Sequence, residues 1–547
     1  MSTFDAFLQP VLLAREPRLN SYLTRLDAFR HWVLTDVEAQ ANYTDRYAPA
    51  ALQAYDREGR ILNRIVSNPQ YNEQHQECYR RGIIALPYDE AAPHLVSFAM
   101  GYLLSQADIS LHCPVTLTGA VAYVIGYHVS EKLRAEYLPE LTRMAGETKT
   151  GGTWATEKHG GSDVGATTTV AKPSKQGFTL HGLKWFASNA NSGLALATAR
   201  PEGAPKGSAG LGLYLVPSHL STGEPNHMLI RRLKDKLGTK GLPTGEIELN
   251  GAEAIEIAAP PAGFKLMMEA LEYSRVHNAV GSAGVQRRAL TEAIAWCNTR
   301  ETFGAKLIDR PMVQDELLRL QLQFEAGSLL AFESALTFDA ALADPTKRTW
   351  LRLVTALAKY LTAEYAIQSC RATLELIGGN AYTSDYPIAR LYRDAQVLTV
   401  WEGPANIQAL ELLRLLSSKY RGAEIYEQRI RGIIERTPDS LATLIRTLKS
   451  RLAEDISDIT LVARDRESSE RYARKLLHRL AQSLGYALLC EHAAEDPHNE
   501  LRLLAAQRYL EDIDPPKLGA EDPRIRKAAL QLIDAPNADL LSRGTAH

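Results

Sequence analysis

The sequence predicts a mostly α-helical protein with a small antiparallel β domain at its centre. Three observations predict this class. Residues 1–150 carry apolar residues at helical spacings, as in Leu95 to Leu104 and Val115 to His128. Between Thr153 and Ala258 the pattern changes to short β-branched and alternating segments. From Gly263 onward, long amphipathic patterns return.

The chain has 547 residues, more than one compact core usually holds, so several domains are expected. The changes of pattern divide the chain into four parts. We predict an N-terminal helical domain at residues 1–150, a β-barrel or sandwich domain at 151–262, a helical bundle at 263–420 and a helical C-terminal extension at 421–547.

The helices of the first and third domains are predicted from apolar spacing and from helix-ending residues. In the first domain a third helix is expected from Ser130 to Met144. In the third domain the expected helices are Ser274 to Ala295, Met312 to Leu342, Thr349 to Ile377 and about Pro404 to Lys419. Gly378 and Gly379 directly follow one of them, which is typical of a helix C-terminus.

The β segments of the second domain are short and are separated by turn residues. They are expected at Thr167 to Val170, Gly177 to Leu180, Leu194 to Thr198, Leu211 to Val216 and Gly245 to Leu249. Pro201 to Gly203 and Leu249 to Gly251 contain the turn signals. This composition favours antiparallel neighbours in a barrel or a sandwich.

Composition and charge exclude several function classes. Lys and Arg number 62 against 64 Asp and Glu, and the net charge of −2 gives no global attraction to nucleic acid. The N-terminus lacks a basic and apolar signal sequence, so we expect a cytoplasmic protein without membrane insertion. The five cysteines and the histidines lack disulfide or ligand spacing, and no metal site is expected.

Two segments of the β domain combine polar and aromatic groups. Thr153 to Asp163 contains Gly160 and Gly161 beside hydroxyl groups, and such a loop can bond a planar heterocycle or a phosphate. Lys184 to Asn189 places two aromatic residues beside a serine, which can cover a ring and bond its edge. Taken alone, the same residues also suit a turn before a strand and an aromatic pair in a β core.

Two segments of the helical bundle carry charges near helix ends. Glu402 lies just ahead of a helix that Pro404 is expected to begin. Its carboxylate suits either a surface charge or a general base beside Trp401. Arg300, followed by Gln314, suits either a surface charge or a contact to a pyrophosphate.

The order and spacing of these segments resemble the acyl-CoA dehydrogenase family of flavoproteins over about residues 80–420. The family's flavin-loop pattern, Thr-Glu-x-x-x-Gly-Ser-Asp, corresponds to Thr156 to Asp163. Its Arg-x-x-Phe-Gly, Gly-Gly-x-x-Tyr and Glu-Gly patterns correspond to Arg300 to Gly304, Gly378 to Tyr382 and Glu402 to Gly403. The resemblance implies the acyl-CoA dehydrogenase-like fold, FAD as cofactor, an acyl-CoA or related acyl ligand, and a homo-oligomer, usually a tetramer built as a dimer of dimers.

The resemblance also implies roles for single residues. Glu402 would be the catalytic base that removes the α-proton of the acyl thioester while the β-hydride passes to flavin N5. The residues that would bind FAD are Trp154, Thr156, Gly161, Ser162, Trp185, Phe186, Ser188, Arg300, Phe303, Gln314, Glu375, Gly379 and Asn406. Of these, Arg300, Phe303 and Gln314 would contact the FAD of a neighbouring subunit, and Glu375 to Gly379 would complete that site.

Further details resemble the AidB-type branch of that family. They are Cys113 to Thr118, Arg232 to Gly238, Trp401 to Gly403 and the helical C-terminal extension. The branch implies one alternative to acyl-CoA turnover, a flavin-binding protein of the response to DNA alkylation that binds duplex DNA. A further alternative is an acyl-chain or lipid-binding protein, which would use the same acyl pocket with little turnover.

The C-terminal extension is where duplex DNA would bind in that alternative. Residues 420–547 hold 20 Lys or Arg and 21 Asp or Glu, so the extension is not basic overall. A local basic cluster is formed by Arg464, Arg466, Arg471, Arg474, Lys475 and Arg479. Acidic residues are interleaved with it, which is typical of a solvated charged helix.

Overall fold

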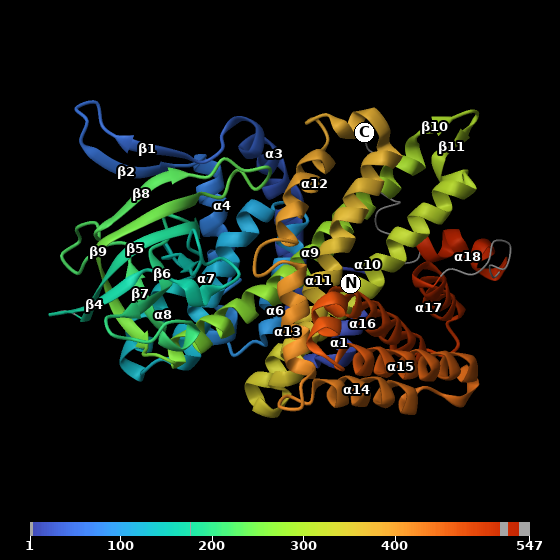
Figure 1. Cartoon of the computed structure of the whole chain (residues 1–547). Coiled ribbons are helices and arrows are strands. Elements are labelled where there is room, and N and C mark those ends of the chain that lie inside the picture. Colours follow the sequence, from blue (N-terminus) through green and yellow to red (C-terminus); the bar gives the residue numbers. More distant parts are fainter. Residues whose placement is uncertain (1–3, 176, 515–522, 535–547) are drawn as a thin grey trace. The chain divides into compact units, whose positions relative to one another are not determined.

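The computed structural model describes residues 4–175, 177–514 and 523–534 (Figure 1). The chain forms two compact units. The barrel unit spans His31–His277, and the bundle unit combines Met1–Arg30 with Asn278–His547. The predicted class, mostly helical with a central β domain, is confirmed.

Buried helices form the first part of the barrel unit. Their bounds are α3 Glu38–Tyr47, α4 Pro69–Arg80, α5 Leu86–Asp89, α6 His94–Ser105, α7 Ile109–His128 and α8 Glu131–Leu141. The three expected helices are present as α6, α7 and α8. α7 begins at Ile109 rather than Val115 because the Asp108 side chain caps it by accepting a hydrogen bond from Ser110 N.

The strands of the barrel unit close into a ring. Their bounds are β1 Ala51–Tyr55, β2 Ile61–Val66, β3 Gly151–Trp154, β4 Val170–Ser174, β5 Gly177–Ser188, β6 Leu194–Pro201, β7 Gly212–Pro217, β8 Met228–Leu233 and β9 Thr244–Ala258. β6, β4, β5, β9 and β7 pair in that order, and β7 pairs back with β6, so the domain is a barrel rather than a sandwich. β3 and β8 extend it, and β1 and β2 form a separate hairpin beside β8 (Figure 1).

The barrel differs from the expected antiparallel pattern at two places. β6 pairs in parallel with both β3 and β4, and each of these pairs is separated along the chain by β5 rather than joined by a hairpin. The expected turn at Leu249 to Gly251 is instead a β-bulge within β9. There Gly251, with φ 84°, is the extra residue between the pairs Leu180↔Ala252 and His181↔Asn250.

The barrel interior is apolar and supports the loop that follows β3. Its residues include Trp154, Ala171, Leu180, Ala187, Ala195, Ala197, Tyr214, Val216, Ile247 and Leu249. β3 lies directly on α7, where Gly151 N donates to Thr118 Oγ1 over 2.9 Å. A Cβ at Gly151 would lie 2.8 Å from Thr118 Cα, so this close approach requires glycine.

Long helices and one short hairpin form the bundle unit. The bounds are α1 Leu8–Arg15, β10 Glu301–Thr302, β11 Ala305–Lys306, α10 Pro311–Ala343, α11 Arg348–Ile377, α12 Pro387–Leu398 and α13 Ala405–Leu416. Two further helices, α2 Leu23–Trp32 and α9 Ala262–Thr299, have residues in both units. α11 ends where Gly378 takes a φ of 78°, as expected. α13 begins at Ala405, and Pro404 is its N-cap residue rather than its first helical residue.

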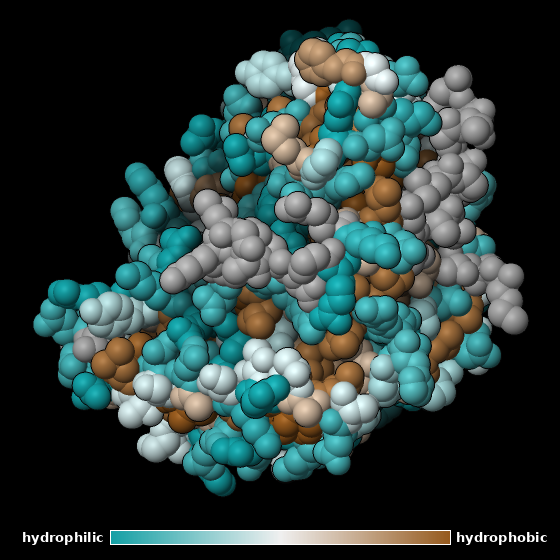
Figure 2. Space-filling model, turned by 90° about the vertical axis from the view of Figure 1, so that its right-hand side faces the viewer, coloured by the Kyte–Doolittle hydropathy of each residue, from teal (hydrophilic) through white to brown (hydrophobic). Residues whose placement is uncertain are grey.

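The C-terminal extension is helical and packs within the bundle unit. Its helices are α14 Gly422–Arg436, α15 Ala442–Val462, α16 Arg466–Ala494, α17 Glu500–Ile513 and α18 Pro523–Asp534. α16 packs against α10, α11 and α13, while α17 and α18 pack against α10. On the face shown in Figure 2, hydrophilic residues predominate and apolar residues are interspersed among them.

Two helices are long and apolar enough to cross a membrane by length and composition. They are Ile109–His128 and Pro311–Ala343. In their most apolar stretches, 94% and 72% of the residues are buried inside the protein. This burial is typical of core helices.

Candidate functional site

The predicted site residues of the barrel unit lie in the loop after β3 and on β5. Trp185 N donates a hydrogen bond of 2.9 Å to Thr156 O, so the loop and the strand are joined. Gly161 and Ser162 are exposed farther along the loop. A Cβ at Gly161 would lie 3.7 Å from Thr156 Cγ2, so the loop folds back towards its own start.

Glu157 anchors this loop inside the protein. Its Oε2 accepts hydrogen bonds of 2.7 Å from both the main-chain N and the Oγ1 of Thr168. Its Oε1 accepts bonds from Thr169 and a 2.8 Å bond from Lys184 Nζ. Lys184 also donates to Thr198 O over 2.7 Å, and both members of the ion pair are almost fully buried. The ion pair therefore fixes the loop to two strands of the barrel.

The charge of Glu157 depends on these partners. Burial alone would raise the pKa of Glu157. The charge of Lys184 and the hydrogen bonds from Lys184, Thr169 and Thr168 outweigh burial and lower the pKa to about 2. Glu157 is therefore a carboxylate at neutral pH, held for structure rather than for proton transfer.

A β-bulge turns two consecutive aromatic residues to one face of β5. Lys184 pairs with Ile247 and Ala187 pairs with Gly245, so Trp185 and Phe186 together oppose one residue of β9. Lys184 and Ala187 are buried, whereas Trp185 is half-buried and Phe186 is 51% exposed. Ordinary alternation would turn one of the two aromatic rings inward, and bulges of this kind re-aim side chains beside sites.

A lysine lies against this aromatic pair. Lys234 Nζ is 3.5 Å from the centre of the Trp185 ring and 4.7 Å from that of Phe186. Lys234 also donates to Glu246 Oε1 over 2.6 Å. A planar heterocycle with phosphate groups would suit these residues. The exposed aromatic rings could stack on the heterocycle, and Lys234, the Ser188 hydroxyl and the Gly161 main-chain amide could donate hydrogen bonds.

Trp154 is placed differently from the other predicted residues of this unit. Its side chain is 1% exposed and belongs to the barrel core. The structure therefore does not bring the Trp154 indole to the face that carries Phe186. The Trp154 side chain is an aromatic residue of the barrel core.

Glu402 has an unusual main-chain conformation. Its φ is 58°, in the left-handed region that favours glycine, and the next residue, Gly403, has a φ of 98°. A Cβ at Gly403 would lie 2.9 Å from Ile407 Cγ2 and 3.0 Å from Gln408 Nε2. The turn before α13 therefore requires glycine at position 403 and places strain on Glu402.

Two buried polar residues hold this turn, and the sequence analysis missed both. Gln408 Nε2 donates to Glu402 O over 3.1 Å and to Gly403 O over 2.9 Å. Lys359 Nζ of α11 donates to Gly403 O over 2.9 Å. Each of the two residues is 1% exposed. The sequence did contain one signal for Lys359, because it is the one charged residue within the apolar pattern of residues 353–361.

Arg300 and Phe303 belong to a tight hairpin between α9 and α10. β10 and β11 pair through Glu301↔Lys306, and the turn residues Phe303 and Gly304 have φ values of 51° and 76°. Arg310 Nη2 donates to Thr302 O and Phe303 O over 2.6 and 2.9 Å, which holds the turn. The Phe303 side chain is 99% exposed.

The other predicted residues of the bundle unit lie at helix ends. Gln314 is on the first turn of α10 and donates to Ile308 O over 3.0 Å. Glu375 is exposed near the end of α11, where Arg371 pairs with it at 3.4 Å, and Gly379 follows. Asn406 is exposed on the first turn of α13. The structure thus gathers Arg300, Phe303 and Gln314 around one hairpin and puts Glu402 and Asn406 at one helix start.

Three arginines of the basic cluster of the extension lie close to acidic residues. Arg471 pairs with Glu467 at 2.7 Å, and Arg479 lies within 4.0 Å of Glu454, Asp455 and Asp458. Arg474 lies 3.9 Å from Glu364. The Arg466 side chain lies outside the described part of the chain. These pairs agree with the prediction of a solvated charged helix.

Sequence models of three protein-family domains match the chain. Residues 4–146 match the adaptive response protein AidB N-terminal domain. Residues 152–252 match the acyl-CoA dehydrogenase middle domain, and residues 262–416 match the acyl-CoA dehydrogenase C-terminal domain.

Individual proteins are similar over most of the chain. AidB of Escherichia coli (strain K12) is 30% identical over 400 residues, which are 71% of this chain and 72% of that protein. A crystal structure of Caenorhabditis elegans ACDH-11 in complex with C11-CoA has a TM-score of 0.81 at 28% identity, covering 90% of this chain and 87% of that one. A Bacillus anthracis acyl-CoA dehydrogenase complexed with FAD has the same fold, with a TM-score of 0.76 at 14% identity over 96% of this chain and 92% of that one.

Proposed function

Because the chain belongs to the acyl-CoA dehydrogenase family, we propose that it is an FAD-dependent acyl-CoA dehydrogenase with Glu402 as its catalytic base. The observation that carries this proposal is the conformation of Glu402, whose strained main chain is held by buried Lys359 and Gln408. Strain of this kind persists mainly at functional sites. A mere surface carboxylate needs no such support.

Each unit contains residues that we propose to bind FAD. In the barrel unit, Thr156, Gly161, Ser162 and Ser188 supply hydroxyls and main-chain amides, and Trp185 and Phe186 supply ring surface. In the bundle unit they are Arg300, Phe303, Gln314, Glu375, Gly379 and Asn406. FAD, when bound, supplies the acceptor for the β-hydride and its electron pair.

The part of Glu402 is the removal of one proton. The α C–H bond of an acyl thioester is weakly acidic, and the Glu402 carboxylate takes this proton. The electron pair of that bond forms the new double bond to the β carbon as the β-hydride leaves. The Glu402 main-chain N–H would donate to the thioester oxygen and stabilise the negative charge that develops there.

An acyl-CoA is the substrate class that we propose. The C11-CoA complex of ACDH-11, a protein 28% identical to this chain, supports this class. The reaction would convert a saturated acyl-CoA into a 2-enoyl-CoA.

We also propose that the protein works as a homo-oligomer, a tetramer built as a dimer of dimers. Phe303 at the hairpin tip is 99% exposed, and two further large apolar side chains of the bundle unit, Met312 and Tyr382, are 85% and 84% exposed. Contact with another subunit would remove these side chains from water. Arg300, Phe303 and Gln314 would then contact the FAD of that subunit.

The experiment that tests the proposal is anaerobic bleaching of the flavin. The purified protein is mixed with acyl-CoAs of several chain lengths, and the visible flavin band is followed. We expect bleaching with at least one acyl-CoA and its loss in Glu402→Gln. Bleaching by none of them, in a protein that contains FAD, would contradict the proposal.

A matched control separates the base from a general effect of neutralising a carboxylate. Glu467 in the extension is exposed and pairs with Arg471 at 2.7 Å. Glu467→Gln should bleach like the unmodified protein. Equal loss of bleaching in both variants would contradict the proposed role of Glu402 as the base.

A further inference from the structure

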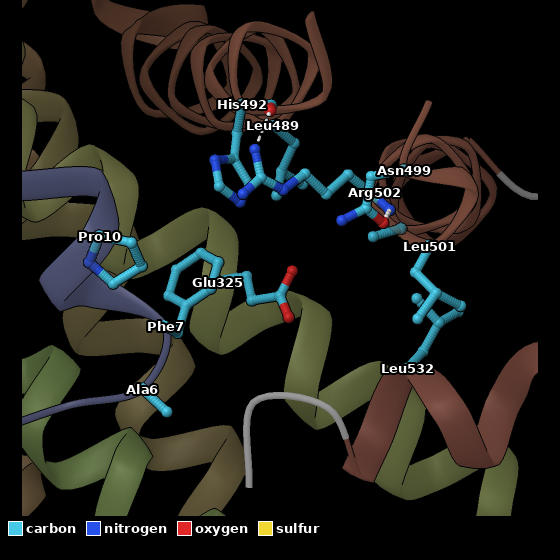
Figure 3. A pocket seen from close by; sticks show the side chains of 11 residues that line it. Ala6, Phe7, Pro10, Glu325, Leu489, His492, Asn499, Leu501, Arg502 and Leu532 are labelled. Atoms are coloured by element: carbon cyan, nitrogen blue, oxygen red, sulfur yellow. Dashed lines mark hydrogen bonds between the residues drawn. The ribbon is translucent and has the colours of Figure 1, made fainter. Parts of the chain in front are cut away.

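A cavity of about 170 Å³ lies in the bundle unit, where the N-terminal segment meets the C-terminal extension. Its walls come from α1 and the segment before it, from α10 and from the extension helices α16, α17 and α18. Figure 3 shows Phe7, Leu501 and Leu532 on its apolar sides and Glu325 between them. None of the residues predicted to bind FAD or acyl-CoA lines this cavity.

The carboxyl group of Glu325 is directed into the cavity (Figure 3). The residue is 6% exposed, and Gln321 Nε2 donates to its Oε1 over 2.7 Å. Among the described residues, no cation lies within 4.0 Å of Glu325, and Gln321 is the hydrogen-bond donor that it has. One oxygen of a buried acid is therefore left to whatever fills the cavity.

The other polar groups around the cavity already have partners. Arg502 Nη1 donates to His492 O over 3.1 Å and lies 4.0 Å from Glu495. His492 Nδ1 lies 3.2 Å from Glu495 Oε2, and the Asn499 side chain caps α17 by accepting from Arg502 N. Among the described residues, the second carboxylate oxygen of Glu325 accepts none of these hydrogen bonds, and a donor in the cavity would satisfy it.

The charged groups on the neighbouring helices are also paired with other residues. α9 contributes Arg287, which pairs with Asp5 of the N-terminal segment at 3.3 Å. α16 contributes His492 and Glu495, and α17 contributes Arg502. Burial raises the pKa of Glu325 to about 7, although Gln321, Arg502 and Arg287 act to lower it. The existing cations therefore leave this carboxyl group poorly stabilised as an anion.

We propose that the cavity binds a small organic ammonium ion, whose charged end pairs with Glu325 and whose apolar part packs against Phe7, Leu501 and Leu532. An ammonium group is a strong donor and a positive charge, which is what a buried carboxylate lacks here. An engineered cavity of about 150 Å³ takes up benzene, so a ligand of about one ring or six carbons matches the volume. The site would join the N-terminal segment to the extension when occupied.

Isothermal titration calorimetry of the FAD-loaded full chain with benzylamine tests this inference. Benzylamine stays protonated between about pH 6 and about pH 8, whereas Glu325 titrates in this interval. Because one unit of pH below the pKa leaves roughly a tenth of the carboxylate, we expect binding about tenfold weaker at pH 6 than at pH 8. Absence of binding at pH 8, or tighter binding at pH 6, would overturn the inference.

Variants identify the site. Glu325→Gln keeps the shape and removes the charge, and it should weaken benzylamine binding at least tenfold. Glu316→Gln on the same helix changes an acid that pairs with Arg319 and should leave binding unchanged. Ala505→Leu fills the cavity and should abolish binding while Glu325 remains.

Titration with benzoate tests whether the cavity prefers an anion to an ammonium ion. A carboxylate ligand would pair with Arg502 and would need a protonated Glu325, so its binding would strengthen at low pH. Benzoate binding that depends on Glu325 and exceeds that of benzylamine would overturn the assignment to an ammonium ion. Unchanged benzylamine binding in both Glu325→Gln and Ala505→Leu would place that binding elsewhere and would overturn it too.

Discussion

Arg429 in α14 and Glu333 in α10 form a bidentate ion pair that connects the C-terminal extension to the helical bundle. Arg429 Nε donates to Glu333 Oε1 over 2.9 Å, and Nη2 donates to Oε2 over 3.2 Å. Arg15 of α1 pairs with the same carboxylate at 2.5 Å. The Glu333 side chain is 4% exposed. One buried carboxylate thus links the N-terminal helix, the bundle and the extension.

Replacement of Arg429 should destabilise the bundle unit strongly. Arg429→Met leaves Glu333 buried with one of its two cations, and losing a partner of a buried pair costs about 3–5 kcal/mol. Urea unfolding would measure this change in the free energy of unfolding. The control is Arg431→Met, an exposed arginine paired with Glu427, where a change of about 0–1 kcal/mol is expected. Equal changes in the two variants would contradict the role of the buried pair.

The Glu333 carboxylate should make the free energy of unfolding depend on pH in the acid range. Burial raises the pKa of Glu333, but Arg15 and Arg429 outweigh burial and lower the pKa to about 2 from an ordinary value of 4.5. Because the folded pKa is the lower one, this stabilisation is complete above about pH 4.5 and is lost as the pH falls towards 2. Unfolding curves at several pH values should therefore show the Arg429→Met deficit shrinking over that interval. A constant deficit would speak against the linkage.

The buried pair of Glu157 and Lys184 should control flavin retention. Glu157→Gln removes the charge partner of Lys184 and weakens the anchor of residues 155–169, so the loop that offers Gly161 and Ser162 loses its position. We expect a loss of stability of about 3–5 kcal/mol and faster FAD release, seen as a rise in flavin fluorescence on dilution. Glu248→Gln, at an exposed pair with Arg231 on the same barrel, should retain FAD normally. Normal FAD retention in Glu157→Gln would refute the anchoring role.

Gln408 should act on the reaction as a positioning residue. Gln408→Leu removes the donor to the carbonyls of Glu402 and Gly403 while keeping the side chain similar in size. A displaced base lowers the rate of proton removal, so we expect kcat to fall about tenfold to a hundredfold with a smaller change in KM. Gln428→Leu, at an exposed position of α14, serves as the control. An unchanged kcat would show that Glu402 keeps its position without Gln408.

The elements that were predicted correctly depend on local signals. The helix from Thr349 to Ile377 became α11 almost residue for residue, because apolar spacing and the glycines after it act within the segment itself. The closure of the barrel depends on pairing between β6 and β7 and on parallel contacts of β6 with β3 and β4. Such pairings join distant segments, and composition does not specify them.

The site residues divide in the same way. Thr156 and Trp185 were recognised as parts of motifs, and the hydrogen bond between them follows from the fold. Lys359 was missed because its partner, the Gly403 carbonyl, lies 44 residues away and carries no side-chain signal. The family resemblance assigned Trp154 to the cofactor, but on β3 its side chain belongs to the buried barrel core.

The left-handed conformation of Glu402 implies a trade-off, because it lowers the stability of the fold at the residue that we propose as the catalytic base. A residue with a Cβ in this region costs about 1–2 kcal/mol, and glycine largely escapes that penalty. Variants selected only for resistance to heat would therefore tend to gain glycine at position 402 and to lose the proposed base. A thermostable descendant of this chain should be assayed for turnover before its melting temperature is counted as an improvement.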